Sequence, residues 1–170
     1  MTRTGWRTAF IAQGESDLKV FHLLRHDAGV EHCHALHYLQ MAAEKVAKGL
    51  NCRDEFTRPE ETHFALVRWI RHAKANPYAR LMTLCGVSTR SQFRAYLHGL
   101  HGFAETIELL APAVARQRGK EQNAEYPWLD AKASTVRYPA VYPFHEVVYN
   151  PKYPKFIRFV EASIEFGKVR

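Results

Sequence analysis

Ionisable side chains recur at helical spacing in one part of the sequence. Histidine transfers protons near neutral pH, and arginine stabilises negative charge on a phosphate. Five ionisable residues follow one another at intervals of four, three, four and three residues, so they share one helix face. This stripe consists of Arg94, His98, His101, Glu105 and Glu108. This pattern could place an arginine, two histidines and carboxylates in one site for acid–base chemistry, with Arg94, His98 and His101 as candidate catalytic residues. The alternative is a solvated polar face with ordinary i,i+4 contacts.

Basic residues outnumber acidic ones, with 24 lysines and arginines against 17 aspartates and glutamates. Such an excess favours a polyanionic partner, because lysine and arginine neutralise phosphates and release counterions. Tyr153 and Phe156 lie within one basic run, where their rings could stack on bases. The alternative is a solvated basic surface. Candidate binding residues for RNA or a nucleotide are Arg68, Arg71, Lys74, Arg137, Lys155 and Arg158.

A cluster of histidine and cysteine side chains at residues 31–37 has some features of a metal site. Cys33 and His37 are one helical turn apart and could supply two ligands. A complete site needs further ligands, and the three cysteines of the chain form no CxxC pair. The sequence also contains no glycine-rich phosphate loop, serine nucleophile elbow or HExxH motif. We expect Cys33 in the core, and we predict neither a metal nor a cofactor.

Helices must position these residues, and the spacing of apolar side chains predicts where the helices run. In the second of them the apolar residues form one continuous stripe. That stripe consists of Leu36, Leu39, Ala43, Val46 and Leu50. In the first predicted helix, we expect Asp17 on the side that faces water. The predicted helices span about residues 8–25, 31–50, 57–76, 88–117 and 155–168.

Local signals predict where the helices begin and break. Thr57 and Glu60 have the spacing of a capping box, which predicts the start of the third helix. Ser88 is the expected cap of the fourth helix. Pro112 should kink or divide that helix, because proline lacks the backbone N–H of a helix interior. A further short helix is possible within residues 78–86.

The chain of 170 residues fits one domain, residues 1–170. The predicted class is all-α, an antiparallel up-and-down bundle of four to five helices. Residues 120–154 are rich in proline and tyrosine, and the prolines exclude helix over most of this stretch. We expect a long irregular insertion before the last helix, packed against the bundle as a flap.

The stretch His37-Tyr38-Leu39-Gln40-Met41-Ala42-Ala43-Glu44-Lys45-Val46-Ala47-Lys48-Gly49-Leu50 resembles the signature helix of the HEPN family. That helix typically shows an aromatic residue, then glutamine, small residues, Glu-Lys and another lysine. Ser16-Asp17-Leu18 and Thr62-His63 are similar to parts of the family's first and third helices. The resemblance implies a bundle that is often dimeric, found in RNA-cleaving toxins, defence systems and nucleotidyltransferase partners. It also implies noncatalytic members that bind nucleotides or proteins.

Catalytic members of the family use an arginine followed, after four to six intervening residues, by a histidine. Three pairs in this chain have that spacing: Arg25 with His32, Arg58 with His63, and Arg94 with His101. Roughly this many matches arise by chance, so the spacing alone does not select a pair. Position on a single helix face favours Arg94 and His101, and Arg58 with His63 is the alternative.

We therefore expect a HEPN-like binding module of a bacterial defence or toxin–antitoxin type system. It would contact RNA, a nucleotide or a partner protein encoded nearby, and it would form a homodimer. The alternatives are a metal-independent ribonuclease and a structural dimer subunit. No apolar run approaches the roughly 20 residues that span a bilayer, and the stretch Met1–Trp6 lacks the pattern of a signal peptide. These features predict a cytoplasmic protein without membrane contact.

Overall fold

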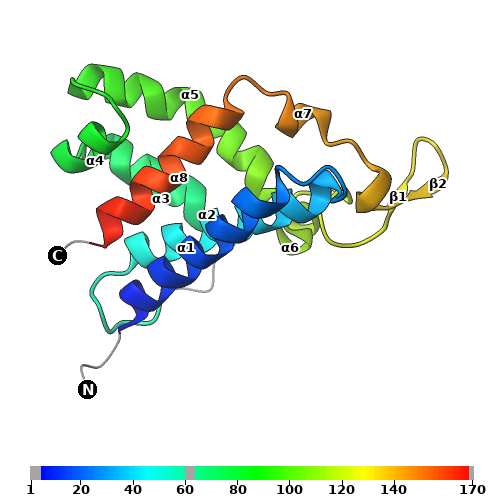
Figure 1. The fold of residues 1–170 in the computed structure, drawn as a ribbon, viewed down its shortest axis with the longest axis horizontal. Coiled ribbons are helices and arrows are strands. Elements are labelled where there is room, and N and C mark those ends of the chain that lie inside the picture. Colours follow the sequence, from blue (N-terminus) through cyan, green and yellow to red (C-terminus); the bar gives the residue numbers. More distant parts are fainter. Residues whose placement is uncertain (1–4, 60–63, 169–170) are drawn as a thin grey trace.

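The computed structural model describes residues 5–59 and 64–168, which form a mostly helical fold with one small sheet. This agrees with the predicted all-α class. Figure 1 shows the short hairpin at the opposite end of the molecule from α4. The elements in chain order are α1 (Trp6–Leu24), α2 (His32–Asn51), α3 (Ala65–Ala75), α4 (Ala79–Leu84), α5 (Arg90–Glu108), α6 (Pro112–Gln117), β1 (Trp128–Asp130), β2 (Thr135–Arg137), the 3-10 helix η1 (Pro139–Val141), α7 (His145–Val148) and α8 (Tyr153–Gly167).

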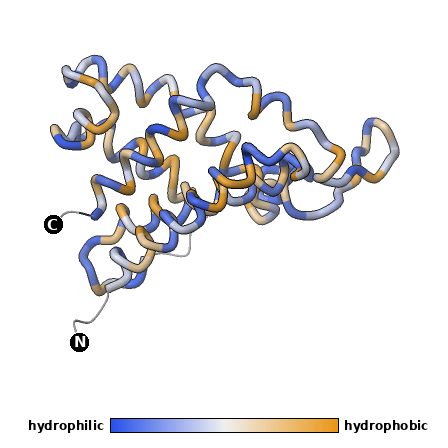
Figure 2. Tube along the Cα trace, in the orientation of Figure 1, coloured by the Kyte–Doolittle hydropathy of each residue, from blue (hydrophilic) through white to orange (hydrophobic). Residues whose placement is uncertain are grey.

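The core lies where α2 meets α1, α3 and α8. Hydrophobic and hydrophilic positions alternate along each helix, as expected for elements with one buried face (Figure 2). In α2, Leu36, Leu39, Ala43 and Val46 are buried, as predicted, and Leu50 is half-buried. Apolar stripes of the later helices are also buried: Leu97, Leu100, Ala104, Ile107 and Ala111, and Phe156, Phe159, Val160 and Ile164. Because Phe156 is buried, its ring is not available to stack on bases as the sequence had suggested.

The start of the third helix was predicted wrongly. The helix begins at Ala65 instead of near Thr57, because Thr57 has another partner. Its hydroxyl donates to a carboxylate oxygen of Asp54 at 2.7 Å, and its backbone N–H donates to the other oxygen at 2.8 Å. Thr57 therefore belongs to a turn that Asp54 organises. Glu60, its expected capping partner, lies outside the described residues.

The fourth predicted helix is divided at Pro112, as expected. It consists of α5, which ends at Glu108, and of α6, which has Pro112 in its first turn. The residue that caps α5 is Thr89 and not Ser88: the Thr89 hydroxyl accepts the backbone N–H of Gln92 at 3.2 Å. The short helix expected within residues 78–86 is α4.

Residues 120–154 are largely irregular, as predicted, but they include a two-stranded antiparallel hairpin that the sequence did not indicate. Trp128 pairs with Arg137 and Asp130 with Thr135. The aromatic residues hold the segment: the ring of Tyr142 lies 5.3 Å from that of Trp128 and 4.9 Å from that of Phe144, centroid to centroid. Trp128 and Phe144 are buried, so the insertion packs through its aromatic side chains.

The α1–α2 pair packs closely because α1 has a glycine at the contact. A Cβ on Gly14 would lie 2.6 Å from Cγ2 of Val46 and 3.1 Å from the carbonyl oxygen of Ala42. A glycine inside an exposed helix usually weakens it by about 1 kcal/mol relative to alanine. At Gly14 the missing side chain instead lets the two backbones approach.

We predict that Gly14→Ala lowers the free energy of unfolding by about 1–3 kcal/mol, because the added methyl group overpacks the α1–α2 contact. Gly102→Ala is the matched control, since nothing lies within 4 Å of the Cβ that it would add. The control should gain up to about 1 kcal/mol from helix propensity. Urea unfolding followed by circular dichroism measures both, and a stabilised Gly14→Ala variant would contradict the close packing.

Candidate functional site at the α3–α5 edge

An arginine and a histidine from different helices meet at the edge between α3 and α5. Nε of Arg71 donates to Nε2 of His101 at 3.1 Å. Oε1 of Glu105, one turn further along α5, lies 3.8 Å from Nδ1 of His101. An arginine can only donate, so Nε2 of His101 must be the unprotonated ring nitrogen and Nδ1 carries the proton. The contact therefore uses Nε2 as an acceptor and leaves Nδ1 on the side of the Glu105 carboxylate.

A buried carboxylate fixes how α3 lies against α5. Oε1 of Glu108 accepts the backbone N–H groups of Leu66 at 2.9 Å and Val67 at 3.1 Å. These belong to the first turn of α3, whose N–H groups have no partner within the helix. Glu108 is 3% exposed, so it caps α3 from inside the core. The two helices are antiparallel, since the start of α3 meets Glu108 and Arg71 meets His101.

The antiparallel arrangement brings the two basic stripes together. On α3, Arg68, Arg71 and Lys74 follow one another at intervals of three residues, so each lies about 60° further around the helix than the one before. Because α3 and α5 are antiparallel with Arg71 at His101, Lys74 lies opposite the part of α5 that holds His98. The α3–α5 face, as we call it, consists of Arg68, Arg71, Lys74, Arg94, His98, His101 and Glu105.

The predicted catalytic residues are only partly brought together. His101 is half-buried and bonded to Arg71, whereas Arg94 and His98 are exposed. Within residues 5–59 and 64–168, neither of these two side chains takes part in a hydrogen bond or ion pair. The arginine that contacts His101 is thus Arg71 of α3, which we had predicted from the sequence as a binding residue and not as a catalytic one. The spacing within one helix could not reveal this, because the partner lies 30 residues away.

Of the alternative catalytic pair, Arg58 and His63, only Arg58 lies within the described residues. The guanidinium carbon of Arg58 lies 5.7 Å from the ring centroid of Trp6, which is the geometry of a cation–π contact. His63 lies outside the described residues. The structure therefore gives no geometry for an Arg58–His63 site.

The remaining predicted binding residues lie apart from this face. Arg137 is on the hairpin, where its Nε is 3.2 Å from Oδ2 of Asp130. Lys155 and Arg158 are exposed on α8, and the carbonyl oxygen of Lys155 accepts the hydroxyl of Tyr96 at 2.8 Å. The basic residues chosen from the sequence therefore do not form one continuous surface.

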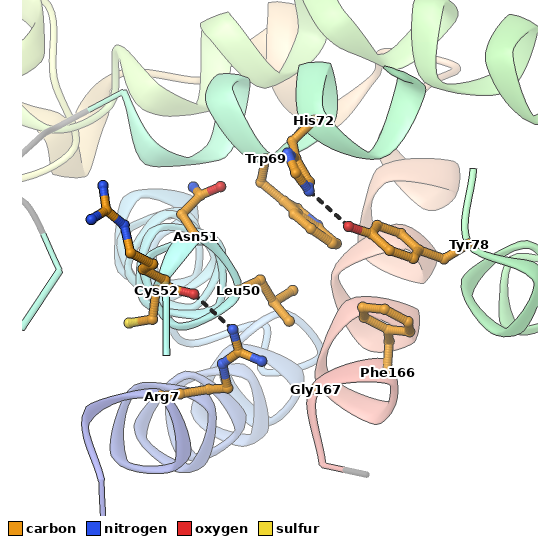
Figure 3. Close-up of a pocket in the computed structure, with 10 residues that line it drawn as sticks. Arg7, Leu50, Asn51, Cys52, Trp69, His72, Tyr78, Phe166 and Gly167 are labelled. Carbon is orange, nitrogen blue, oxygen red and sulfur yellow. Dashed lines mark hydrogen bonds between the residues drawn. The ribbon is translucent and has the colours of Figure 1, made fainter. Parts of the chain in front are cut away.

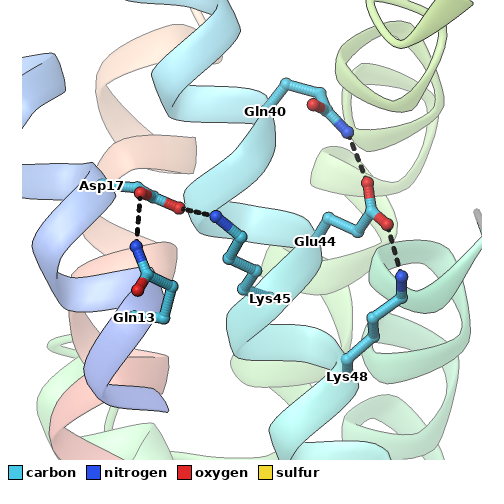
Figure 4. A network of polar contacts seen from close by, with 6 residues as sticks. All are labelled: Gln13, Asp17, Gln40, Glu44, Lys45 and Lys48. Atoms are coloured by element: carbon cyan, nitrogen blue, oxygen red, sulfur yellow. Dashed lines mark hydrogen bonds and ion pairs between the residues drawn. The ribbon is translucent and has the colours of Figure 1, made fainter. Parts of the chain in front are cut away.

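The polar residues of the Glu-Lys helix bond to one another along α2 and to α1 (Figure 4). Nζ of Lys45 lies 2.5 Å from Oδ2 of Asp17, which joins α2 to α1. Asp17 is 4% exposed, so the expectation that it faces water was wrong. Glu44 accepts from Gln40 at 2.7 Å and pairs with Lys48 at 2.6 Å along α2.

The histidine and cysteine cluster at the start of α2 has no metal-binding geometry in the part of the chain that the structure describes. No three His, Cys, Asp or Glu side chains there are grouped around a common point. Cys33 is buried in the core, and burial raises the pKa of its thiol. Nδ1 of His37 instead lies 3.5 Å from Oε1 of Glu125.

Comparison of the chain with protein-family models, with curated proteins and with solved structures found no match. Among the helices of residues 5–59 and 64–168, none combines the length and the apolar composition of a membrane span. The case for a function therefore depends on the geometry of the site.

Burial changes the proton affinity of the carboxylate that caps α3. Desolvation raises the pKa of Glu108 to about 7, although the two backbone N–H groups oppose the shift. Because the folded protein holds this proton more tightly than the unfolded chain, Glu108 stabilises the fold most below pH 4.5. That contribution is lost as the pH rises through about 7.

We predict that Glu108→Gln removes a pH-dependent part of the stability. Glutamine keeps an oxygen that accepts the α3 N–H groups and cannot ionise. The variant should equal the wild type near pH 4.5 and exceed it at pH 8, by on the order of 1–3 kcal/mol. Thermal unfolding at a series of pH values tests this. If both proteins lose the same stability between pH 5 and 8, the buried carboxylate is not the titrating group.

Proposed function

We propose that this chain is a HEPN-like helical module that binds RNA through its α3–α5 face, in a bacterial defence or toxin–antitoxin type system. The observation that carries the proposal is the contact between Arg71 and His101, which joins two stripes of basic and histidine side chains from neighbouring helices. Phosphate contacts from such a face give affinity without requiring base recognition. The HEPN-like assignment is supported by the position of the Glu-Lys signature on α2, at the centre of the helical core.

The charge of the chain supports RNA over a neutral partner. The sequence carries a formal net charge of +7 at neutral pH. Arg71 is exposed and bonds to a histidine instead of a carboxylate, and Arg94 has no ion-pair partner among the described residues. Binding a phosphate would satisfy these cations and release the counterions that surround the RNA.

We predict that the protein binds single-stranded RNA with an affinity that falls as salt rises. Removing two phosphate contacts with Arg71→Ala/Lys74→Ala should reduce the slope of log K against log salt by about 1.4, since each contact to a single strand contributes about 0.7. Fluorescence anisotropy with a labelled oligonucleotide measures the slope.

The matched control is Lys132→Ala/Arg137→Ala, which removes the same charge from the hairpin. It should keep the wild-type slope, because Arg137 already pairs with Asp130. The proposal fails if the wild type does not bind at low salt. It also fails if the hairpin variant loses as much of the slope as the α3 variant.

A second candidate function is metal-independent cleavage of RNA, favoured by the state of His101. The contacts at the α3–α5 edge present Nε2 as the unprotonated nitrogen, with Glu105 facing the protonated one. When a phosphate draws Arg71 away, Nε2 can take the proton of the 2′-hydroxyl. The 2′-oxygen then attacks phosphorus and the bond to the 5′-oxygen breaks, leaving a 2′,3′-cyclic phosphate. His98, one turn earlier, would protonate the leaving oxygen.

If the protein cleaves RNA, we predict that His101→Ala and Arg71→Ala each slow cleavage by about a hundredfold or more, with the thermal midpoint unchanged. Arg94→Ala should have a smaller effect, because Arg94 lies near the start of α5, away from the Arg71–His101 contact. Cleavage of total RNA in the presence of a chelator is the assay. Equal cleavage by all variants would place the catalytic groups elsewhere, and a wild type without activity would leave the binding function alone.

A further inference from the structure

A pocket of about 330 Å³ lies on another side of α3, where the start of α1, the end of α2, α3, Tyr78 and the end of α8 come together. Figure 3 shows the rings of Trp69, Tyr78 and Phe166 along one side, with Arg7 and the end of α2 across from them. The pocket is lined by aromatic rings, backbone and cationic side chains. Aromatic groups beside a few convergent polar groups are typical of small-molecule sites.

The aromatic side of the pocket is held in place by its neighbours. The ring of Trp69 lies 6.2 Å from that of Tyr78 and 6.0 Å from that of Phe166, with interplanar angles of 18° and 28°. Nε1 of Trp69 donates to the hydroxyl of Ser163 at 3.1 Å in the core. The hydroxyl of Tyr78 lies 2.7 Å from Nε2 of His72. Trp69 is 2% exposed, so Tyr78 and Phe166 are the rings that a ligand would touch.

The opposite side carries two arginines, Arg7 and Arg53, and the carboxylates of Glu55 and Asp54 are near enough to interact with them electrostatically without forming an ion pair. Nη2 of Arg7 donates to the carbonyl oxygen of Cys52 at 2.7 Å, and Nε of Arg7 is buried without a hydrogen-bond partner among the described residues. Arg53, which also lines the pocket, is exposed. In the described part of the chain, no Asp or Glu oxygen lies within 4.0 Å of either guanidinium group.

We infer that this pocket binds a small planar anion: an aromatic or heterocyclic ring that carries a single phosphate or carboxylate group. The ring packs against Tyr78 and Phe166, and the anionic group bonds to Arg7 and Arg53. A volume of about 330 Å³ admits one ring system and one anionic group and excludes an oligonucleotide. The site is distinct from the α3–α5 face, so it does not depend on RNA binding there.

Four probes test the chemistry by isothermal titration: adenosine monophosphate, an indole carboxylate, adenosine and inorganic phosphate. At least one of the two ring anions should bind, and the one that binds identifies phosphate or carboxylate as the preferred group. Adenosine and inorganic phosphate should bind at least about tenfold more weakly than that anion. The inference is overturned if neither ring anion binds, or if adenosine or phosphate alone binds equally well.

Variants locate the binding in the pocket. Arg53→Gln should weaken binding of the ring anion by about tenfold or more, because a charge-assisted hydrogen bond is lost at an exposed position that the fold does not need. Phe166→Leu should also weaken binding of the ring anion, because it removes an aromatic ring against which the ligand packs. Arg90→Gln is the control, since it removes an exposed arginine that does not line the pocket. If Arg53→Gln and Phe166→Leu bind as the wild type does while their thermal midpoints are unchanged, the ligand binds elsewhere and the inference is wrong.

Discussion

The buried carboxylate of Glu108 determines where α3 lies, and both candidate sites depend on α3. By accepting two N–H groups of the first turn, it holds the start of that helix against the end of α5. The register that follows brings Arg71 to His101 on one side of α3. On the other side it leaves Trp69 facing α8, where the ring forms part of the aromatic pocket. A single polar contact in the core thus positions two surfaces of different chemistry.

The α1–α2 pair provides the frame against which α3 and α8 pack. Gly14 permits the close approach, and the Asp17–Lys45 pair joins the two helices at a point where Asp17 is buried. An ion pair of this kind adds little net stability, but leaving its carboxylate unpaired would be costly. The Glu-Lys helix therefore contributes to the architecture, whereas the cations of the α3–α5 face come from α3 and α5.

Much of the fold could be predicted from the sequence, because helical periodicity is a local property. The stripe of α2 and the break at Pro112 were predicted correctly for this reason. The start of α3 was not, because its cap comes from Glu108 on another helix and no local motif marks it. Local patterns were also insufficient for the site. The ionisable face of α5 could be predicted from its spacing, but the pairing of Arg71 with His101 could not, because it is a contact between residues that are distant in the sequence. The aromatic pocket combines five segments of the chain, and only tertiary packing unites them.

The central claim is that the α3–α5 face, positioned by Glu108, is where RNA binds. The most direct measurement is a backbone amide NMR titration of labelled protein with a short single-stranded RNA at low salt. We expect the resonances of residues 68–75 and 94–105 to shift together and to saturate at one RNA concentration, while those of the hairpin at residues 128–137 stay in place. Shifts confined to the hairpin or to α8, with α3 and α5 unchanged, would contradict the account.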